Sequence, residues 1–465
     1  MTKKHSNVSR RQFLSSAAVA GATGALGGAG GFLTACSSGG GSVENQYTPL
    51  HPLNELYIPD LPDKAIDGKP LKAALIGCGA RGTGAAIDFM DAADDVTIVA
   101  CADLFKDQMD NCRKNLKEKK NIEIADDRCF LGLDAYKKAC EIPDLDLVLI
   151  ASPTLFHPEQ FSYAIEMGKH VFCEKPAAID AAGYRKYMMA VKQAETKGLC
   201  VVTGTCQRHE RGFVESYRKV QEGYIGRIVA GYVYTAMGSH DFKRRRPEWT
   251  DMEYMIRDFF SWCWLSGDFL VDQLIHELDI FTWYSHLKPV NAFGTGARLR
   301  KNTGNNYDSF SVDLEFEGGI HVHAIERRID NCTNKLGTII QGTKGVFNNI
   351  GNERFTIYDL DGNEVWKYDS RSARKQFKQH NPYVLEHVNL VNHIRQGKVI
   401  NQGEATALSS MALIMGRESA YSGKVVTWDE MTQSELNFMP EEMTLGNVDM
   451  SKYTVIPLPG TAVEH

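Results

Sequence analysis

The chain has 465 residues, enough for two domains, and its content of 43% hydrophobic and 24% charged residues is typical of a globular protein. The formal net charge is −6 at pH 7, and no cluster of lysines and arginines stands out beyond the run 243–246. Nucleic acid is therefore not an expected partner, because binding to a polyanion needs a basic surface.

Residues 1–36 have the pattern of an export signal. The hexapeptide SRRQFL at 9–14 matches the twin-arginine consensus, and an alanine- and glycine-rich segment follows at 17–32. The sequence LTAC at 33–36 resembles a bacterial lipobox, which implies cleavage before Cys36 and lipidation of its thiol. No other stretch is apolar enough to span a bilayer.

These signals predict twin-arginine export and a periplasmic location, with the lipid as the only membrane contact. Residues 37–70 would form a flexible tether and an N-terminal arm. The alternative is a cytosolic chain with a flexible, glycine-rich leader.

The stretch 71–103 has the pattern of a dinucleotide-binding unit. An apolar run at 71–76 predicts a buried strand, and Gly77, Gly79 and Gly82 follow it in G-x-G-x-x-G spacing. Gly77 permits the tight turn, Gly79 lets a pyrophosphate approach the backbone, and Gly82 lets the next helix pack against the strand. Because an anion is stabilised at a helix N-terminus, Ala80 and Arg81 are assigned to the same site.

An acidic residue completes this unit. A second apolar run, 96–102, ends in Asp103, whose carboxylate can accept a hydrogen bond from a ribose 2′-hydroxyl and would repel a 2′-phosphate. The pattern therefore favours NAD over NADP. The alternative is a glycine-rich turn without a ligand, but the order of strand, glycines, helix, strand and acid favours a nucleotide site.

Strand and helix patterns alternate up to about residue 205. Helices are predicted at 106–119, 158–167 and 181–197, and strands at 146–151, 170–174 and 201–205. Beyond an amphipathic helix at 214–222, period-two alternation predicts strands at 227–234, 309–316, 321–325 and 337–341. We therefore predict an α/β protein with a Rossmann domain at 71–205 and, at 206–465, an α+β domain with an open, mostly antiparallel sheet.

The eleven cysteines do not indicate disulfides or a metal site. Cys78, Cys101, Cys173 and Cys200 lie in or beside predicted buried strands, as small core residues do. There is no C-x-x-C pair and no tight Cys/His cluster in the sequence, so no metal is predicted.

Two further motifs, together with the glycine loop, resemble those of the Gfo/Idh/MocA oxidoreductases. The sequence CEKP at 173–176 carries an E-K-P signature, and 267–279 is similar to the family's G-G-x-x-x-D-x-G-x-H-x-x-D helix, with departures at Asp268 and Leu274. The resemblance covers about 71–428. It implies a homo-oligomeric enzyme, a dimer or tetramer, that uses NAD on a sugar, glycoside or cyclitol.

By this resemblance Lys175, Asp272 and His276 are the candidate catalytic residues. Asp272 and His276 are four residues apart and share one helix face. A histidine oriented by a carboxylate titrates near neutrality and suits proton abstraction, while Lys175 would stabilise negative charge on the substrate oxygen. The ordinary alternatives are a core histidine and a surface lysine.

Other residues are assigned around this centre. The resemblance also assigns five residues to the cofactor. Ser152, Pro153 and Thr154 form a turn that would lie over the nicotinamide, His157 follows this turn, and Glu174 is the acid of the E-K-P signature. The predicted substrate-binding residues are polar or aromatic side chains near the cleft: Arg208, His209, Trp262, Trp264 and Arg327. For the tryptophans the alternative is a core position, and for Arg327 a surface charge.

The leading prediction is an NAD-dependent oxidoreductase acting on a secondary hydroxyl, with tightly bound NAD that is recycled in place. One alternative is cleavage of a glycoside through transient oxidation, elimination and re-reduction. The other is a nucleotide-binding lipoprotein without catalysis, for which loss of Lys175 or His276 would be the signature; both are present.

Overall fold

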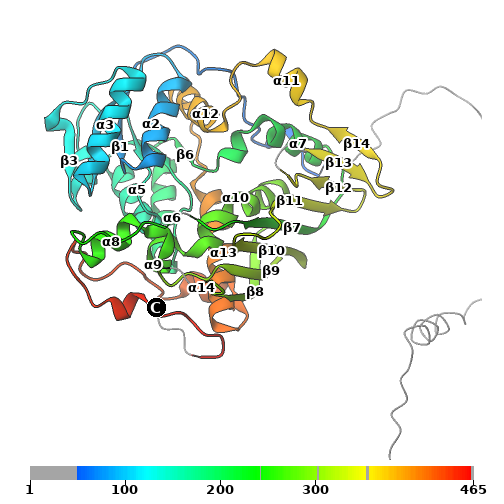
Figure 1. Cartoon of the computed structure of the whole chain (residues 1–465). Helices are drawn as coiled ribbons and strands as arrows, with labels where there is room; N and C mark the ends of the chain where they lie inside the picture. The colour runs from blue at the N-terminus through cyan, green and yellow to red at the C-terminus, as the bar shows by residue number, and fades with distance from the viewer. Residues whose placement is uncertain (1–49, 241, 301–302, 352–354, 462–465) are drawn as a thin grey trace, which may run out of the picture. The chain divides into compact units, whose positions relative to one another are not determined.

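The structure is a computed structural model that describes residues 50–240, 242–300, 303–351 and 355–461 (Figure 1). The predicted export signal, Cys36 and residues 37–49 of the predicted tether and arm lie outside the described residues. No helix among the described residues is long and apolar enough to cross a membrane.

The first sheet has six parallel strands in the order β3-β2-β1-β4-β5-β6, the order of dinucleotide-binding folds. The strands are β1 (Leu71–Ile76), β2 (Val96–Asp103), β3 (Cys129–Leu131), β4 (Leu147–Ile150), β5 (His170–Cys173) and β6 (Val201–Thr203). The apolar runs of β1 and β4 are buried because helices cover both faces of the sheet.

Two buried hydrophobic clusters lie on opposite sides of this sheet. One is built with α2 (Ala80–Ala92) and α3 (Lys106–Lys120), the other with α4 (Ala135–Cys140), α5 (His157–Glu166) and α6 (Ala181–Thr196). The predicted Rossmann-type sheet is therefore confirmed. β6 ends at Thr203, two residues before the predicted end, and a 3-10 helix follows at Cys206–His209.

The second sheet has nine strands in the order β14-β13-β12-β11-β7-β10-β9-β8-β15, and all pairs are antiparallel except β7 with β10. The strands are β7 (Ile228–Met237), β8 (Pro289–Ala297), β9 (Ser309–Phe316), β10 (Ile320–Arg328), β11 (Lys335–Gly342), β12 (Gly345–Asn348), β13 (Thr356–Asp359), β14 (Glu364–Lys367) and β15 (Val426–Thr427). The mostly antiparallel sheet is confirmed.

Helices pack on one face of this second sheet. On β9 the side chains of Phe310, Val312, Leu314 and Phe316 are buried while the alternate residues are less buried, as period two requires. α10 (Asp268–Ser285) contacts β7, β10 and β11, and α13 (Gly403–Ser422) contacts β8 and β9. The remaining helices are α7 (Arg211–Gln221), α8 (Asp251–Arg257), α9 (Cys263–Ser266), α11 (Ser370–Gln376), α12 (Pro382–Gln396) and α14 (Trp428–Gln433).

One late helix packs with the first sheet rather than the second. α12 lies beside α2 and also contacts β5 and β6 (Figure 1). Just after it, Asn401 forms a parallel bridge with Val201 of β6. A division near residue 205 separates the two sheets, but α12 brings side chains from the end of the chain to the glycine loop.

Candidate active site

One cavity of about 630 Å³ lies at the carboxyl ends of the parallel strands and extends to α10. This is where open α/β sheets bind their ligands. Thirteen of the predicted cofactor-binding and catalytic residues line it: Gly77, Gly79, Ala80, Arg81, Asp103, Ser152, Pro153, Thr154, His157, Glu174, Lys175, Asp272 and His276. Residues from the ends of the parallel strands and from α10 therefore meet in one space.

The glycines of the loop differ in what surrounds them. Gly77 has φ +90°, a backbone conformation that favours glycine. A Cβ added at Gly82 would lie 1.8 Å from the carbonyl oxygen of Gly77, whereas one added at Gly79 would meet no atom within 4 Å. The helix thus packs tightly at Gly82, and the loop at Gly79 is open to the cavity, which leaves the room that a dinucleotide pyrophosphate needs.

Asp103 holds the loop from the end of β2. Its Oδ2 accepts a hydrogen bond from the backbone N–H of Cys78 (2.6 Å), and its Oδ1 accepts one from the N–H of Phe105 (2.7 Å). Burial raises the pKa of Asp103, and these two backbone hydrogen bonds oppose that shift. The carboxylate lines the cavity where the ribose is predicted.

Arg81 does not offer a free positive charge to an anion. It forms ion pairs with Glu174, with Asp88 (3.4 Å) and with Glu386 (3.3 Å) of α12, and its guanidinium lies 4.6 Å from the centre of the Tyr383 ring. Glu386 is completely buried. The network ties α12 and the E-K-P segment to the start of α2, so the carboxylate of Glu174 is engaged by the protein.

The predicted catalytic residues meet at the α10 side of the cavity. The Nζ of Lys175 donates to the backbone oxygen of Asp272 (2.5 Å) and lies 3.5 Å from its Oδ2. Both side chains are largely buried: that of Asp272 is 4% exposed and that of Lys175 is 13% exposed. The ammonium is therefore anchored to the helix that carries His276.

The expectation that His276 titrates near neutrality because a carboxylate orients it is wrong. Burial, with the nearby positive charges of Lys175 and Arg81, lowers the pKa of His276 to about 3. Its Nδ1 has no hydrogen-bond partner among the described residues, and Asp272 instead bonds with Gln273 and Lys175. His276 is thus an uncharged ring at neutral pH.

A chain of hydrogen bonds through Gln273 and Arg328 holds the Asp272 carboxylate in place. Gln273 donates from Nε2 to the Oδ2 of Asp272 and accepts at Oε1 from Nη2 of Arg328 (3.1 Å). Arg328 is itself paired with the buried Glu326 (2.9 Å). Because Arg328 can only donate, it orients the Gln273 amide so that the NH₂ group faces Asp272. Arg328 is a positioning residue that the motif did not indicate.

The turn at 152–154 is held by polar contacts. Ser152 donates to Gln160 (2.6 Å), and the two ring nitrogens of His157 lie 2.8 Å from the oxygen of Pro176 and 2.9 Å from that of Ser152. Burial lowers the pKa of His157. This histidine links the turn to the E-K-P segment, so its contacts are structural although it lines the cavity.

The structure shows what surrounds Asp268 and Leu274, the two residues that depart from the helix motif. Asp268 has φ +73°, in the left-handed region where glycine is favoured, and its carboxylate accepts from the N–H of Tyr307 (2.9 Å) and from the hydroxyl of Tyr421. Burial raises the pKa of Asp268 to about 7. Leu274 is fully buried on α10. These contacts explain how the motif tolerates larger residues there.

The five predicted substrate-binding residues do not line the cavity. Arg208 pairs with Asp279 through two hydrogen bonds (2.6 and 2.9 Å), and Arg327 donates to the backbone oxygen of Thr333 (2.7 Å). Trp264 lies in α9 and Trp262 directly precedes this helix, and both are only 2–6% exposed because they pack in the hydrophobic core. The core alternative holds for both tryptophans.

His209 lies in the interior, where its Nε2 is 3.1 Å from the Asn389 amide nitrogen and 3.4 Å from that of Gln402. Both partners are donors, so this nitrogen must be unprotonated. Burial, with the positive charge of Arg208, lowers the pKa of His209 to about 3. The 3-10 helix after β6 turns this side chain inward, away from the predicted cleft position.

The buried His209 should make the protein sensitive to acid. Between the unfolded pKa of about 6.5 and the folded value, the unfolded chain binds a proton that the folded chain does not, so stability falls as pH falls, by up to about 1.4 kcal/mol per pH unit. We expect His209→Gln to lower stability near neutrality and to give a shallower decline between about pH 7 and about pH 5 in urea unfolding. The exposed His380→Gln is the control, and an unchanged slope in His209→Gln would contradict the assignment.

Several cavity residues were not predicted. They come from the segment before α10 and include His240, Lys243, Arg257, Asp258, Phe259 and Phe260. Asp258 accepts from the backbone N–H of Lys243 (2.7 Å), and Arg257 bonds with Asp107 of α3 (2.8 and 3.0 Å). The basic run 243–246 and the aromatic pair at 259–260 were visible in the sequence, but no motif connected either of them with the site.

Comparison with known proteins agrees with this geometry. Residues 71–205 match the oxidoreductase family with an NAD-binding Rossmann fold, and residues 213–348 match the GFO/IDH/MocA C-terminal domain. The fold and site thus define an oxidoreductase with a nucleotide-binding domain and a second, sheet-forming domain. The chain belongs to the GFO/IDH/MocA family. Residues 7–27 match the twin-arginine translocation signal, so the chain is marked for export by that route.

Two relatives and one solved structure are representative. Myo-inositol 2-dehydrogenase of Thermotoga maritima is 26% identical over 255 residues, which are 54% of this chain and 66% of that protein. Glycosyl hydrolase family 109 protein 1 of Bacteroides thetaiotaomicron is 30% identical over 183 residues, 39% of this chain and 37% of that protein. The matches span less than two thirds of either relative's length.

The crystal structure of scyllo-inositol dehydrogenase from Lactobacillus casei with bound NAD(H) and scyllo-inositol superposes with a TM-score of 0.58 at 19% identity. It covers 77% of this chain and 99% of that chain. This likeness shows that the two proteins share a fold.

Proposed function

We propose that this protein is an NAD-dependent oxidoreductase that acts on a secondary hydroxyl of a sugar, glycoside or cyclitol. The observation that carries the proposal is the meeting of Lys175, Asp272 and His276 in the same cavity as the open glycine loop. The inositol dehydrogenase among the relatives supports the substrate class.

NAD fits the residues at the Rossmann end of the cavity. Gly77, Gly79 and Ala80 would hold the diphosphate at the start of α2, and Asp103 would hold the ribose. Bound NAD supplies a hydride acceptor, or in its reduced form a hydride donor. The residues 152–154 and Glu174 would flank the nicotinamide.

The residues at the α10 end can move the proton and stabilise charge. The ammonium of Lys175, fixed by Asp272, would face the substrate oxygen and stabilise negative charge that develops as hydride leaves the carbon. The uncharged ring of His276 can accept a hydrogen bond from the same hydroxyl. The hydroxyl proton would then pass to the uncharged ring of His276, because the ammonium of Lys175 is already protonated, while hydride leaves the carbon.

Asp103 should make the protein prefer NAD to NADP. Its half-buried carboxylate would repel a 2′-phosphate, and the neighbouring Leu104 offers no positive charge. We expect nucleotide extracted from the purified protein to be NAD, and Asp103→Asn to narrow the difference between NAD and NADP affinity. The exposed Asp110→Asn should leave the preference unchanged. Tighter binding of NADP than of NAD by the unsubstituted protein would overturn the assignment.

We also propose that the nucleotide stays bound and is recycled in place. An exported enzyme meets little free NAD, so NAD would enter during folding before export and each oxidation would be matched by a reduction at the same site. Nanomolar retention requires about 12 kcal/mol of binding free energy, which an enclosed dinucleotide can supply. We further propose that Cys36 is lipidated and that the protein is periplasmic. We also propose that it forms a homo-oligomer through the open sheet, where Val290 and Phe293 of β8 are exposed.

Exhaustive dialysis tests the closed cycle. The mature protein is dialysed and then assayed with pairs of donor and acceptor sugars without added NAD. Retained nucleotide and turnover without added NAD are expected. If the protein emerges empty and works only with stoichiometric NAD, simple dehydrogenation remains and recycling is rejected.

A second candidate function is glycoside cleavage through transient oxidation, elimination and re-reduction. It is favoured by the 30% identity to a protein named glycosyl hydrolase family 109 protein 1. It uses the same cavity and the same first step. Release of an aglycone from an aryl glycoside by the dialysed protein would favour this function over net redox chemistry.

A further inference from the structure

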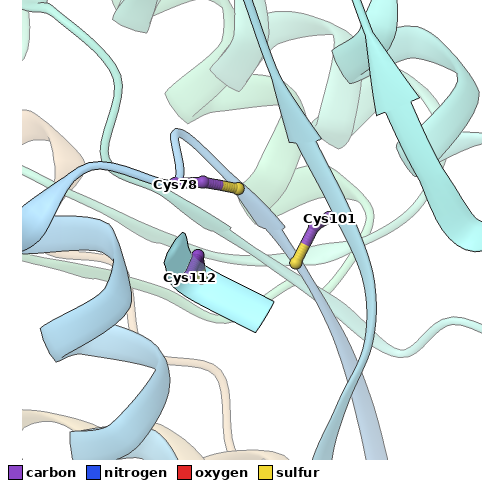
Figure 2. A group of neighbouring side chains, drawn as sticks. All are labelled: Cys78, Cys101 and Cys112. Atoms are coloured by element: carbon purple, nitrogen blue, oxygen red, sulfur yellow. The ribbon is translucent and has the colours of Figure 1, made fainter. Parts of the chain in front are cut away.

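Three cysteines from separate segments meet behind the glycine loop. Cys78 lies in the loop after β1, Cys101 in β2 and Cys112 in α3, and Figure 2 shows these three residues on neighbouring segments of the chain. Their sulfur atoms all lie within 4.8 Å of one another, and the three residues are 2%, 0% and 0% exposed. The sequence spacing did not predict this cluster because each cysteine belongs to a different element.

We propose that Cys78, Cys101 and Cys112 form a thiolate site for one thiophilic metal ion of the Zn²⁺ or Cu⁺ type. Three sulfurs bound to one zinc ion at about 2.3 Å lie roughly 3.8 to 4.0 Å apart, so the observed spacing needs only a small contraction. Each thiol loses its proton as the metal–sulfur bond forms, and the protons are released to solvent.

The contacts of the sulfurs favour this site over isolated core thiols. The three sulfur atoms all lie within 4.8 Å of one another, and the Cys78 thiol also donates to the backbone oxygen of Ala102 (3.7 Å), so the sulfurs face one another and a polar group rather than only apolar side chains. The Thr83 hydroxyl donates to the backbone oxygen of Cys78 (3.2 Å), so this side chain lies next to Cys78. A group of three buried sulfurs is the donor set that soft cations select.

The surrounding charge also fits a bound cation with three thiolates. Zn²⁺ with three thiolates carries one net negative charge, and Cu⁺ would carry two, so burial favours zinc. Cys78 directly precedes Gly79, the residue at the N-terminus of α2, where the helix dipole stabilises negative charge. A bound ion would cross-link the glycine loop, β2 and α3, and would therefore stabilise the fold.

Metal content of the full chain tests the proposal. Because the thiols are buried, the protein is produced in medium supplied with zinc or with copper, purified under reducing conditions and desalted against a weak chelator. We expect about one zinc or copper ion per chain in the wild type and almost none in Cys112→Ser. Cys140→Ser, which removes a buried thiol of α4 outside the cluster, should keep the ion.

X-ray absorption at the metal edge of the wild-type protein decides the ligands even if Cys112→Ser fails to fold. Three sulfur neighbours at about 2.3 Å support the site. A spectrum with only nitrogen and oxygen neighbours would place the ion elsewhere, for example in the cavity beside His276, and would overturn the proposal. Wild-type protein without zinc or copper from either medium would overturn it as well.

Discussion

Replacement of Lys175 with methionine is expected to lower turnover by about 10²–10⁴-fold, the usual contribution of a general acid-base group. The ammonium is the one cationic side chain that is anchored to Asp272 beside His276 among the described cavity residues. Methionine keeps the length of the side chain but cannot stabilise an alkoxide. Steady-state rates with an accepted sugar or cyclitol measure the effect.

The same variant should keep its fold and its nucleotide. Lys175 makes its contacts at the α10 end of the cavity, so the glycine loop and Asp103 stay unchanged. Lys186→Met, which removes a half-exposed lysine paired with Glu159 on the surface, is the matched control and should turn over normally. Turnover of Lys175→Met near that of the wild type would remove Lys175 from the proposed site.

The second large effect is expected at Gly79. Gly79→Ala should fold normally, because its Cβ meets no protein atom within 4 Å, but should bind NAD roughly tenfold or more weakly, a loss of about 1.4 kcal/mol or more. The added methyl group would occupy the space where the pyrophosphate approaches the backbone. Fluorescence or calorimetric titration with NAD measures the affinity, and thermal unfolding measures the fold.

Gly82→Ala is the contrasting variant. Its Cβ would lie 1.8 Å from the oxygen of Gly77, a backbone atom, so we expect a loss of about 3 kcal/mol or more of folding stability. The two glycines thus separate ligand binding from packing. If Gly79→Ala bound NAD as tightly as the wild type, the pyrophosphate would not pass over this loop.

Much of the fold followed from local patterns. The strands β1 and β9 have the predicted bounds, α3 and α6 differ from prediction by one residue at one end, and α5 is shifted by one residue at both ends. Buried apolar runs, period-two alternation and the glycine spacing are short-range signals, because they reflect how consecutive residues face a sheet or helix surface. For the same reason the open glycine loop with Asp103 beside it could be predicted.

The polar environment of the site could not be predicted in this way. The neutral state of His276 depends on burial and on Lys175 and Arg81, which come from distant elements. The inward turn of His209 depends on donors from α12 and from the residue before α13. No short-range pattern contains these neighbours.

The sequence by itself determined the family, the dinucleotide loop, the twin-arginine signal and which lysine, aspartate and histidine are candidates for chemistry, because each depends on residue types at fixed short spacings. Only the tertiary structure decided which polar side chains face the cavity. It placed Arg208 and Trp262 in the interior and brought Cys78, Cys101 and Cys112 together. These outcomes depend on how helices rotate and pack against the two sheets, and that is set by contacts between residues far apart in the chain.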